Sequence, residues 1–325
     1  MIITRTPFRV SLCGGGSDLP AFYEKNGGCV ISTTINKYMY ITSHPSFDNK
    51  KTVLKYSKTE SVENINDIEH SIFRECLRKE GLEGLEITSV ADVPQGTGLG
   101  SSSSFTVGLL KNLKCHKREY ISDHDVAEAA CDMEINILGN PIGKQDQYAA
   151  AFGGLNFYQF NKNGTVDVEP VLLDHDKFKQ LEKNLLMLYV GGEHSASAIL
   201  KEQSKNMVSA KEKEEGQKRI VELTHQLKYE LEHGNIDAVG TTLHENWLIK
   251  KTLASGISNP KFDEWYDKAL ANGATGGKIL GAGGSGFFLF YVPEEKQEKF
   301  REAMKELPEM EFKFDHQGTT VIFVN

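Results

Sequence analysis

The 325-residue chain carries 37 Lys and Arg against 45 Asp and Glu, giving a formal net charge of −8, and 39% of its residues are hydrophobic. This length exceeds what one hydrophobic core usually organises, so we expect a globular protein of two packed lobes. The negative charge opposes non-specific attraction to nucleic acid and to anionic membranes, and we expect neither as a partner.

Cysteine usage and the N-terminal segment predict a cytoplasmic protein. The cysteine count is odd, and no two cysteines form a CxxC pair, which favours reduced thiols. The N-terminal segment alternates like a strand and lacks the apolar run and cleavage site of a signal peptide. No stretch reaches the roughly 18 to 20 apolar residues that span a bilayer. The five cysteines are Cys13, Cys29, Cys76, Cys115 and Cys131.

The first half of the chain is expected to alternate between strands and helices. β-branched and aromatic residues cluster at 2–12 and 29–43, which predicts two strands. Residues 84–96 predict a further strand ending in a turn, and residues 101–113 predict a helix that begins with serine caps. The order is therefore strand, glycine-rich loop and helix.

A second helix is expected to begin at Ser122 or Asp123 and to stop at the Gly139-Asn140-Pro141 break, which places Glu134 near its end. The composition changes between residues 165 and 175, and the apolar run that starts at Leu185 predicts a buried strand.

We place the boundary between the two lobes at this change of composition, which gives domains of residues 1–172 and 173–325. Residues 196–255 have the spaced apolar positions of helices that bury one face. These helices could supply a partner surface, so a homo-oligomer is left open. The last residues, 319–324, predict a strand.

The segment 94–104 packs glycines and hydroxyl side chains where a strand should turn into a helix. Glycines let backbone N–H groups approach an anion closely, and the helix N-terminus adds the positive end of a dipole. The segment therefore predicts a phosphate-binding loop, although a flexible Gly/Ser linker is the alternative. It has no lysine for a P-loop, and Ser101 stands where the pattern GxGxxG needs glycine. The candidate phosphate-binding residues are Pro94, Gly96, Gly98, Leu99, Gly100, Ser101, Ser102 and Ser103.

Residues 281–286 match GxGxxG literally and alone would suggest a dinucleotide-binding dehydrogenase. A Rossmann fingerprint must follow a strand and open a helix, whereas the residues after Gly286 predict a strand. We therefore reject the dehydrogenase interpretation.

Glu134 and Asp146 flank the GNPIGKQ break, and such a pair could serve a metal and a base. Mg²⁺ typically takes only one or two protein oxygens, and Ser102 with Glu134 would satisfy that number. Arg9 could keep Asp146 ionised, because a nearby cation lowers the pKa of a carboxyl group. The alternative for each of these residues is an ordinary surface position.

Three segments together resemble the GHMP kinases, which are named for galactokinase, homoserine kinase, mevalonate kinase and phosphomevalonate kinase. TPFRVSLCGGGSD is similar to motif one, VPQGTGLGSSSS to motif two and KILGAGGSGFFL to motif three. The resemblance implies an α+β fold of two domains, the first like ribosomal protein S5 domain two and the second ferredoxin-like. It also implies that the candidate phosphate-binding residues of the 94–103 loop bind ATP, with Ser102 and Glu134 holding Mg²⁺. Asp146 would be the catalytic aspartate and Arg9 the basic residue of motif one.

The first motif departs from the galactokinase pattern, GEHTD, because Gly15 and Gly16 replace the Glu and His. Asp18 keeps the last acid. We expect the missing side chains to leave room for a longer or phosphorylated sugar, with Asp18 accepting hydrogen bonds from ring hydroxyls. The candidate substrate-binding residues are Gly15, Gly16, Ser17, Asp18, Gly283 and Gly284.

The fuller string PFRVSLCGGGSDLPAFY, with KYSKTE and QDQYAAAFGG, is similar to D-glycero-D-manno-heptose 7-phosphate kinases. That resemblance implies ATP-dependent phosphorylation of the anomeric C1 hydroxyl to give a 1,7-bisphosphate, for activated heptose and surface glycans. Fucokinase-like and galactokinase-like sugar 1-kinases are the alternatives, and a non-enzymatic nucleotide-binding sensor is the rival from another class. A substrate phosphate would need a cation, and the sequence does not choose among Lys37, Lys144 and Lys278.

Overall fold

The computed structural model describes residues 1–47, 50–192 and 196–325, and it contains one large and one small β-sheet. The large sheet has the strand order β12-β1-β2-β5-β3-β4, and β6, β7 and β11 join it through β2. Its strands are β1 (Ile2–Cys13), β2 (Gly28–Pro45), β3 (Thr52–Lys55), β4 (Thr59–Val62), β5 (Leu85–Ala91), β6 (Asn156–Phe160), β7 (Val166–Pro170), β11 (Phe314–Asp315) and β12 (Thr320–Val324).

The small sheet has the order β8-β10-β9 and is antiparallel throughout. Its strands are β8 (Leu185–Gly191), β9 (Gly276–Ile279) and β10 (Gly286–Tyr291). The last of these confirms that the residues after the GxGxxG match form a strand, so the glycines lie in a loop between two strands. All six residues of β10 are buried, as expected for the central strand of a covered sheet.

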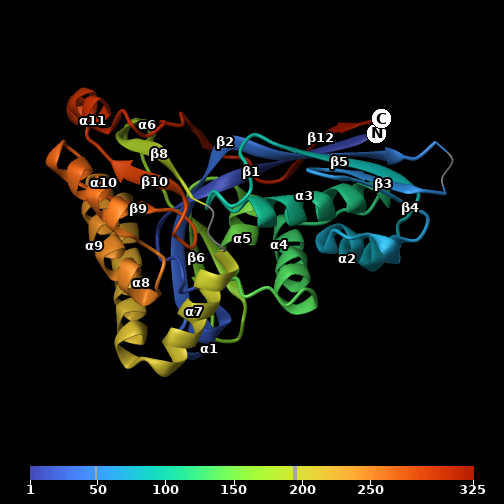
Figure 1. The fold of residues 1–325 in the computed structure, drawn as a ribbon, viewed down its shortest axis with the longest axis horizontal. Helices are drawn as coiled ribbons and strands as arrows, with labels where there is room; N and C mark the ends of the chain where they lie inside the picture. Colours follow the sequence, from blue (N-terminus) through green and yellow to red (C-terminus); the bar gives the residue numbers. More distant parts are fainter. Residues whose placement is uncertain (48–49, 193–195) are drawn as a thin grey trace.

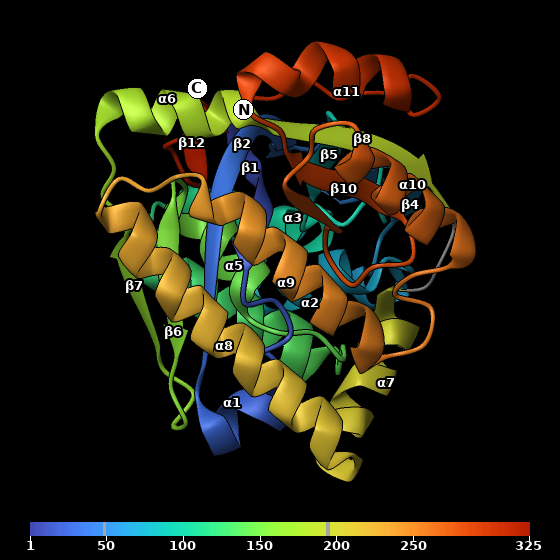
Figure 2. The same ribbon diagram turned by 90° about the vertical axis from the view of Figure 1, so that its left-hand side faces the viewer.

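The helices cover both sheets (Figure 1). Helices α2, α3 and α4 lie along one face of the large sheet, and the long helices α8 and α9 lie beside one another near the small sheet (Figures 1 and 2). The helices are α1 (Pro20–Asn26), α2 (Ser71–Glu80), α3 (Ser101–His116), α4 (Asp123–Cys131), α5 (Gln145–Phe152), α6 (His175–Asn184), α7 (Ala196–Ser209), α8 (Lys211–Glu232), α9 (Ala238–Leu253), α10 (Pro260–Ala271) and α11 (Gln297–Met304). Three single turns complete them: η1 (Ile65–Asp67), η2 (Asp132–Ile137) and η3 (Glu294–Lys296).

The predicted order of strand, loop and helix around residues 94–104 is confirmed by β5 and α3. Helix α3 is buried around most of its circumference, because it lies between the large sheet and helices α4 and α5. The second predicted helix also forms, and Ser122 caps it by accepting a hydrogen bond from the backbone N–H of Asp125. It continues into a π-helical turn, η2, before the Gly139 break.

The two ends of the chain lie together in the large sheet (Figure 1). Strand β12 pairs antiparallel with β1, and β11 pairs with β2, so this sheet draws strands from both halves of the sequence. The expected domain limits of residues 1–172 and 173–325 stay a prediction. Within the described residues, no helix is long and apolar enough to cross a membrane.

Candidate active site

The loop between β5 and α3 has the backbone conformation that its glycines predict. Gly96, Gly98 and Gly100 have φ angles of 78°, 80° and 77°, a left-handed conformation that non-glycine residues adopt at a cost. Gly100 is the N-cap of α3, so the loop delivers the chain directly to the helix N-terminus. Free backbone N–H groups and the positive end of the helix dipole meet there, which is the physical requirement for binding phosphate.

The glycine-rich loop between β9 and β10 packs backbone to backbone against this phosphate-binding loop. A Cβ atom on Gly98 would lie 2.6 Å from the carbonyl oxygen of Leu280, and one on Gly281 would lie 2.6 Å from Cα of Gly98. A Cβ atom on Gly286 would lie 2.2 Å from the carbonyl oxygen of Thr97. Glycine is therefore required in both loops for close approach.

Arg9 and Asp146 form a two-pronged ion pair beside the phosphate-binding loop. Arg9 Nε donates to Asp146 Oδ1 over 2.7 Å, and Nη2 donates to Oδ2 over 2.9 Å. Arg9 Nη1 donates to the carbonyl oxygen of Gly98 over 2.6 Å, which ties the pair to the loop. A Cβ atom on Gly100 would lie 3.3 Å from Asp146 Oδ2, so the carboxylate faces the N-terminus of α3.

Arg9 is almost fully buried at 3% exposure, whereas Asp146 keeps 25% of its side chain accessible. The accessible part of the carboxylate can therefore meet a substrate while the guanidinium fixes its orientation.

Ser102, in the first turn of α3, lies next to Glu134. Ser102 Oγ donates to Glu134 Oε1 over 2.9 Å, and Gln147 Nε2 donates to Glu134 Oε2 over 2.8 Å. Burial raises the pKa of Glu134, and hydrogen bonds from Ser103, Ser102 and Gln147 oppose that rise. Glu134 is carried by the π-helical turn η2, a kind of irregularity found often at functional sites.

This pair fits a magnesium ion. Mg²⁺ prefers oxygen ligands and usually takes one or two from the protein, with phosphate and water oxygens supplying the rest. A buried carboxylate next to a serine hydroxyl supplies those oxygens at the phosphate-binding loop. The described residues contain no group of three or more His, Cys, Asp or Glu side chains that could hold a metal.

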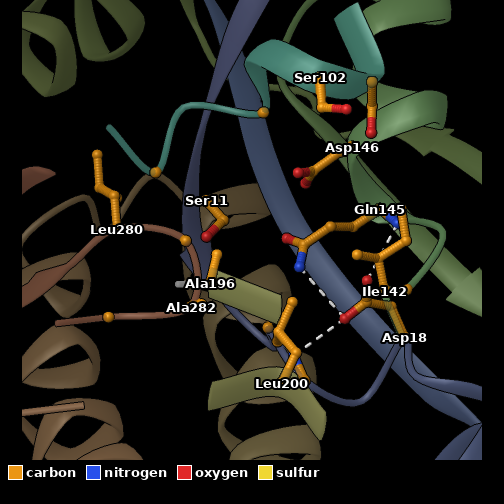
Figure 3. A pocket seen from close by; sticks show the side chains of 18 of the residues that line it. Ser11, Asp18, Ser102, Ile142, Gln145, Asp146, Ala196, Leu200, Leu280 and Ala282 are labelled. Atoms are coloured by element: carbon orange, nitrogen blue, oxygen red, sulfur yellow. Dashed lines mark hydrogen bonds between the residues drawn. The ribbon is translucent and has the colours of Figure 1, made fainter. Parts of the chain in front are cut away.

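Asp18 lies at the opposite end of the site from the phosphate-binding loop (Figure 3). Asp18 Oδ1 accepts hydrogen bonds from the backbone N–H of Gly16 over 2.9 Å and from Gln145 Nε2 over 3.2 Å. Oδ2 accepts from the backbone N–H of Gln145 over 3.2 Å. Burial, and then the charge of Asp146, raise the pKa of Asp18.

The space beside Gly16 is not empty. A Cβ atom there would lie 2.4 Å from Gln203 Nε2 and 2.9 Å from Gln217 Oε1, so side chains of α7 and α8 approach the glycine. A Cβ atom on Gly15, in contrast, would meet nothing closer than 3.6 Å. The room expected from the missing Glu and His side chains is therefore found beside Gly15 but is filled beside Gly16.

One cavity of about 400 Å³ joins these groups. Figure 3 shows the carboxylate of Asp146 between Ser102 and the side chains of Ser11 and Gln145. The apolar part of the lining comes from Ala196 and Leu200 of α7, from Leu280 and Ala282 of the β9–β10 loop, and from Ile142, which lies beside Gln145 (Figure 3).

The structure brings most of the candidate residues to this cavity. Those that line it are Arg9, Gly15, Gly16, Asp18, Gly96, Gly98, Gly100, Ser101, Ser102, Ser103, Glu134, Asp146 and Gly283.

Four candidates lie outside the lining. Ser17 Oγ donates to the carbonyl oxygens of Gly14 and Cys29, and so holds the turn after β1. The carbonyl oxygen of Leu99 accepts from the backbone N–H of Arg9, and Pro94 accepts from the Thr97 hydroxyl. Gly284 donates its backbone N–H to Ile257. Each of these contacts holds a loop in place.

The cavity also contains polar side chains that sequence reasoning missed. Gln145 and Asn246 line the cavity, and each has a buried amide oxygen that has no hydrogen-bond partner among the described residues. Ser11 and Lys250 line the same space. The alternation of β1 places Ser11 on the same face as Arg9, and helical spacing places Asn246 and Lys250 on one face of α9. The strand and helix periodicities therefore indicated which of these residues share a face. No local sequence pattern indicates that α9 packs against this cavity.

Comparison with known proteins decides the family. The family model described as GHMP kinases N terminal domain matches residues 66–154, and the model for GHMP kinases C terminal matches residues 227–309. The D-glycero-alpha-D-manno-heptose 7-phosphate kinase of Campylobacter jejuni is 30% identical over 94% of this chain and 93% of its own length. The chain belongs to the GHMP kinases.

Other relatives agree with this membership. The galactokinase of Pyrococcus furiosus is 26% identical over 93% of this chain and 92% of its own length. A crystal structure of a D-glycero-D-manno-heptose 1-phosphate kinase from Bacteroides thetaiotaomicron superposes with a TM-score of 0.82 at 25% identity, covering all of both chains. This GHMP kinase therefore has the mixed α/β fold of two domains that its sequence predicted, and it is an ATP-dependent sugar kinase that phosphorylates an alcohol group.

Proposed function

We propose that this GHMP kinase transfers the γ-phosphoryl group of ATP to the anomeric C1 hydroxyl of D-glycero-D-manno-heptose 7-phosphate, giving the 1,7-bisphosphate. The observation that carries the proposal is the position of Asp146, whose accessible carboxylate faces the helix N-terminus within a single cavity. The similarity to the Campylobacter jejuni enzyme supports the choice of sugar.

Asp146 is the group that orients the C1 hydroxyl and accepts its proton. As the hydroxyl oxygen forms its bond to the γ-phosphorus, the bond from that phosphorus to the β,γ-bridging oxygen breaks and ADP leaves. Arg9 keeps the carboxylate aimed, because both of its oxygens accept guanidinium hydrogen bonds. The reaction needs correct positioning and charge stabilisation more than covalent catalysis.

The glycine loop and the start of α3 bind the triphosphate through backbone N–H groups and the helix dipole. Ser102 and Glu134 would hold Mg²⁺ at this point. When bound there, Mg²⁺ would supply positive charge that offsets the negative charge developing on the transferring phosphoryl group.

The hydroxyl-rich acceptor occupies the other end of the cavity. Gln145 and Asn246 line the cavity, and their buried amide oxygens have no hydrogen-bond partner among the described residues. A side-chain rotation that brings these oxygens to the cavity surface would let them accept hydrogen bonds from sugar hydroxyls and would satisfy two costly buried acceptors. Asp18 fixes the amide of Gln145 by accepting from its Nε2 and so sets which way the oxygen points.

A coupled assay of ADP release tests the proposal across four acceptors: D-glycero-D-manno-heptose 7-phosphate, L-fucose, D-galactose and D-mannose. We expect the heptose phosphate to give the highest kcat/KM, and ³¹P spectra of the product to show a new phosphate on the anomeric carbon. A higher kcat/KM for fucose or galactose would reject heptose 7-phosphate as the substrate and would favour a fucokinase-like or galactokinase-like sugar 1-kinase. Binding of ATP without turnover of any sugar would favour a nucleotide-binding sensor.

A further inference from the structure

Lys278 places a cation in the cavity that the mechanism above does not use. It belongs to β9, its residue is only 2% exposed, and its side chain lines the cavity. Among the described residues its one hydrogen-bond partner is the hydroxyl of Ser11, at 3.3 Å. An ammonium group has three donors, so two of them have no protein acceptor there.

The neighbouring lysine, Lys250, donates to the backbone, and burial, with the charges of Lys278 and Arg9, lowers its pKa well below the usual range. Its Nζ donates to the carbonyl oxygen of Ile279 over 2.9 Å and to that of Gly281 over 2.6 Å. These contacts hold the end of β9 and the following loop, and they leave one donor free. In the part of the chain that the structure describes, no acid forms an ion pair with Lys250 or with Lys278.

The three acidic side chains that line the cavity form hydrogen bonds with residues other than Lys250 and Lys278. Asp146 pairs with Arg9, and Glu134 accepts from Ser102 and Gln147. The third acid, Asp18, accepts from Gln145 and from the backbone.

A buried cation without a counter-ion is costly, because it has lost its water and gained no anion. Burial, together with the charge of Arg9, lowers the pKa of Lys278 to about 8, while the thiol of Cys13 opposes this change. A ligand that brings a negative charge next to Lys278 would offset this cost.

We propose that Lys278, with the hydroxyl of Ser11 and the free donor of Lys250, forms a subsite for a phosphate group carried by the sugar acceptor. This inference rests on the proposed function and deepens it, because it assigns the second phosphate of the substrate to named residues. The two other cations that the sequence left open do not line the cavity. Lys144 instead donates to the carbonyl oxygen of Gly164 over 2.5 Å.

The location favours the acceptor over ATP as the source of this phosphate. Ser11 lies two residues beyond Arg9 on the same face of β1, toward the Gly15 to Asp18 turn. The helix N-terminus, with Ser102, lies on the far side of Asp146 from this turn (Figure 3). An acceptor whose reactive hydroxyl meets Asp146 can therefore direct a distal phosphate toward Lys278 while the triphosphate occupies the glycine loop.

The kinetic test compares Lys278→Met with the wild type on heptose 7-phosphate and on the same heptose without its phosphate. We expect kcat/KM for the phosphorylated sugar to fall by about 100-fold, the scale of removing one partner of a buried charge pair. The value for the unphosphorylated sugar should change by less than about threefold, and the KM for ATP should not change. Lys37→Met, which removes a cation outside the cavity, is the matched control and should leave both sugars unaffected.

Equal loss on both sugars would contradict the subsite, because Lys278 would then contact the ring or support the fold. A rise in the KM for ATP would also contradict it and would assign Lys278 to the nucleotide phosphates.

A binding measurement keeps the subsite testable if no heptose is turned over, an outcome that would reject only the proposed substrate. With the nucleotide site filled by magnesium and AMPPNP, inorganic phosphate should bind the wild type at pH 7. Lys278→Met should bind it at least tenfold more weakly. Equal phosphate affinity in the two proteins would overturn the subsite.

Stability separates this role from a structural one. Without ligand, Lys278→Met should melt at a temperature equal to or above that of the wild type, because it removes an uncompensated buried charge. Phosphate should raise the melting temperature of the wild type only. A variant that folds but melts well below the wild type would mean that Lys278 holds the fold together, and would contradict the proposal.

Discussion

Asp146 combines two properties that are hard to obtain together in one carboxylate. Its oxygens are fixed by the guanidinium of Arg9, yet a quarter of its side chain remains accessible to the cavity. A surface aspartate would be accessible but mobile, and a buried one would be fixed but unreachable. The Arg9 pair therefore supplies orientation without closing the site.

We expect Asp146→Asn to lower kcat by about 10² to 10⁴, the range attributed to a general base. The amide still fills the space and accepts one hydrogen bond from Arg9, so the KM for ATP should change little. Steady-state kinetics with both substrates measure this. A kcat close to that of the wild type would remove Asp146 from the proton-transfer role.

Glu134→Gln should raise the magnesium concentration needed for half-maximal activity far more than the KM for the sugar, because only the metal loses a charged ligand. The matched control is Asp132→Asn, in the same π-helical turn, whose carboxylate pairs with Lys79 on the surface. A magnesium titration of the three proteins compares them. Identical curves for Glu134→Gln and the wild type would show that Glu134 does not bind the ion.

At the scale of elements, the site depends on the contact between two glycine loops from distant parts of the sequence. The phosphate-binding loop follows β5 and the second loop joins β9 to β10, and their backbones touch at Gly98 and Gly281. Lys250 on α9 holds the second loop through its carbonyl groups. The position of the triphosphate site therefore depends on the small sheet as well as on the large one.

A pair of alanine substitutions isolates this contact. Gly96 and Gly98 have φ angles of 78° and 80°, so alanine costs about 1–2 kcal/mol of backbone strain at either position. A Cβ atom meets nothing within 4 Å at Gly96 but lies 2.6 Å from the Leu280 carbonyl at Gly98. We expect Gly98→Ala to lower the free energy of unfolding by about 1–3 kcal/mol more than Gly96→Ala does. Equal losses in denaturant titrations would mean that the two loops do not pack as described.

Local sequence patterns predicted the elements but not every partner. Glycine and serine at 94–104 predicted the strand, loop and helix, because backbone freedom and helix capping are encoded within a few residues. The positions of Asn246 and Lys250 in the cavity depend on where α9 packs. The contact of Ser11 with Lys278 depends on which face of β1 meets β9. Those facts arise from tertiary packing: Lys250 contacts Ile279 and Gly281, 29 and 31 positions away, and Ser11 contacts Lys278, 267 positions away.

At the scale of the whole molecule, the last strand of the chain, β12, forms an edge of the large sheet. Strand β12 pairs with β1, and the N-terminal amine of Met1 donates to the carbonyl oxygen of Asn325 over 2.9 Å. The sequence predicted a final strand but gave no indication of which strand it would join. The β-pattern of residues 319–324 fits either sheet, and only the assembled fold distinguishes them.

Deleting residues 320–325 should lower the melting temperature by a few degrees, because several ladder hydrogen bonds worth about 1 kcal/mol each are lost. The matched control is Phe323→Thr, which removes an exposed side chain and keeps the backbone pairing. Differential scanning calorimetry compares the proteins. A loss from Phe323→Thr as large as that from the deletion would assign the effect to the side chain instead of the pairing.

The central claim is that the glycine loop, the Ser102–Glu134 pair and Asp146 form one phosphoryl-transfer site. A crystal structure with magnesium, AMPPNP and a sugar acceptor tests it most directly. We predict that the triphosphate lies along residues 96–103, that the ion contacts Ser102 and Glu134, and that an acceptor hydroxyl lies within hydrogen-bond distance of Asp146. A nucleotide bound elsewhere, or an acceptor remote from Asp146, would contradict the claim.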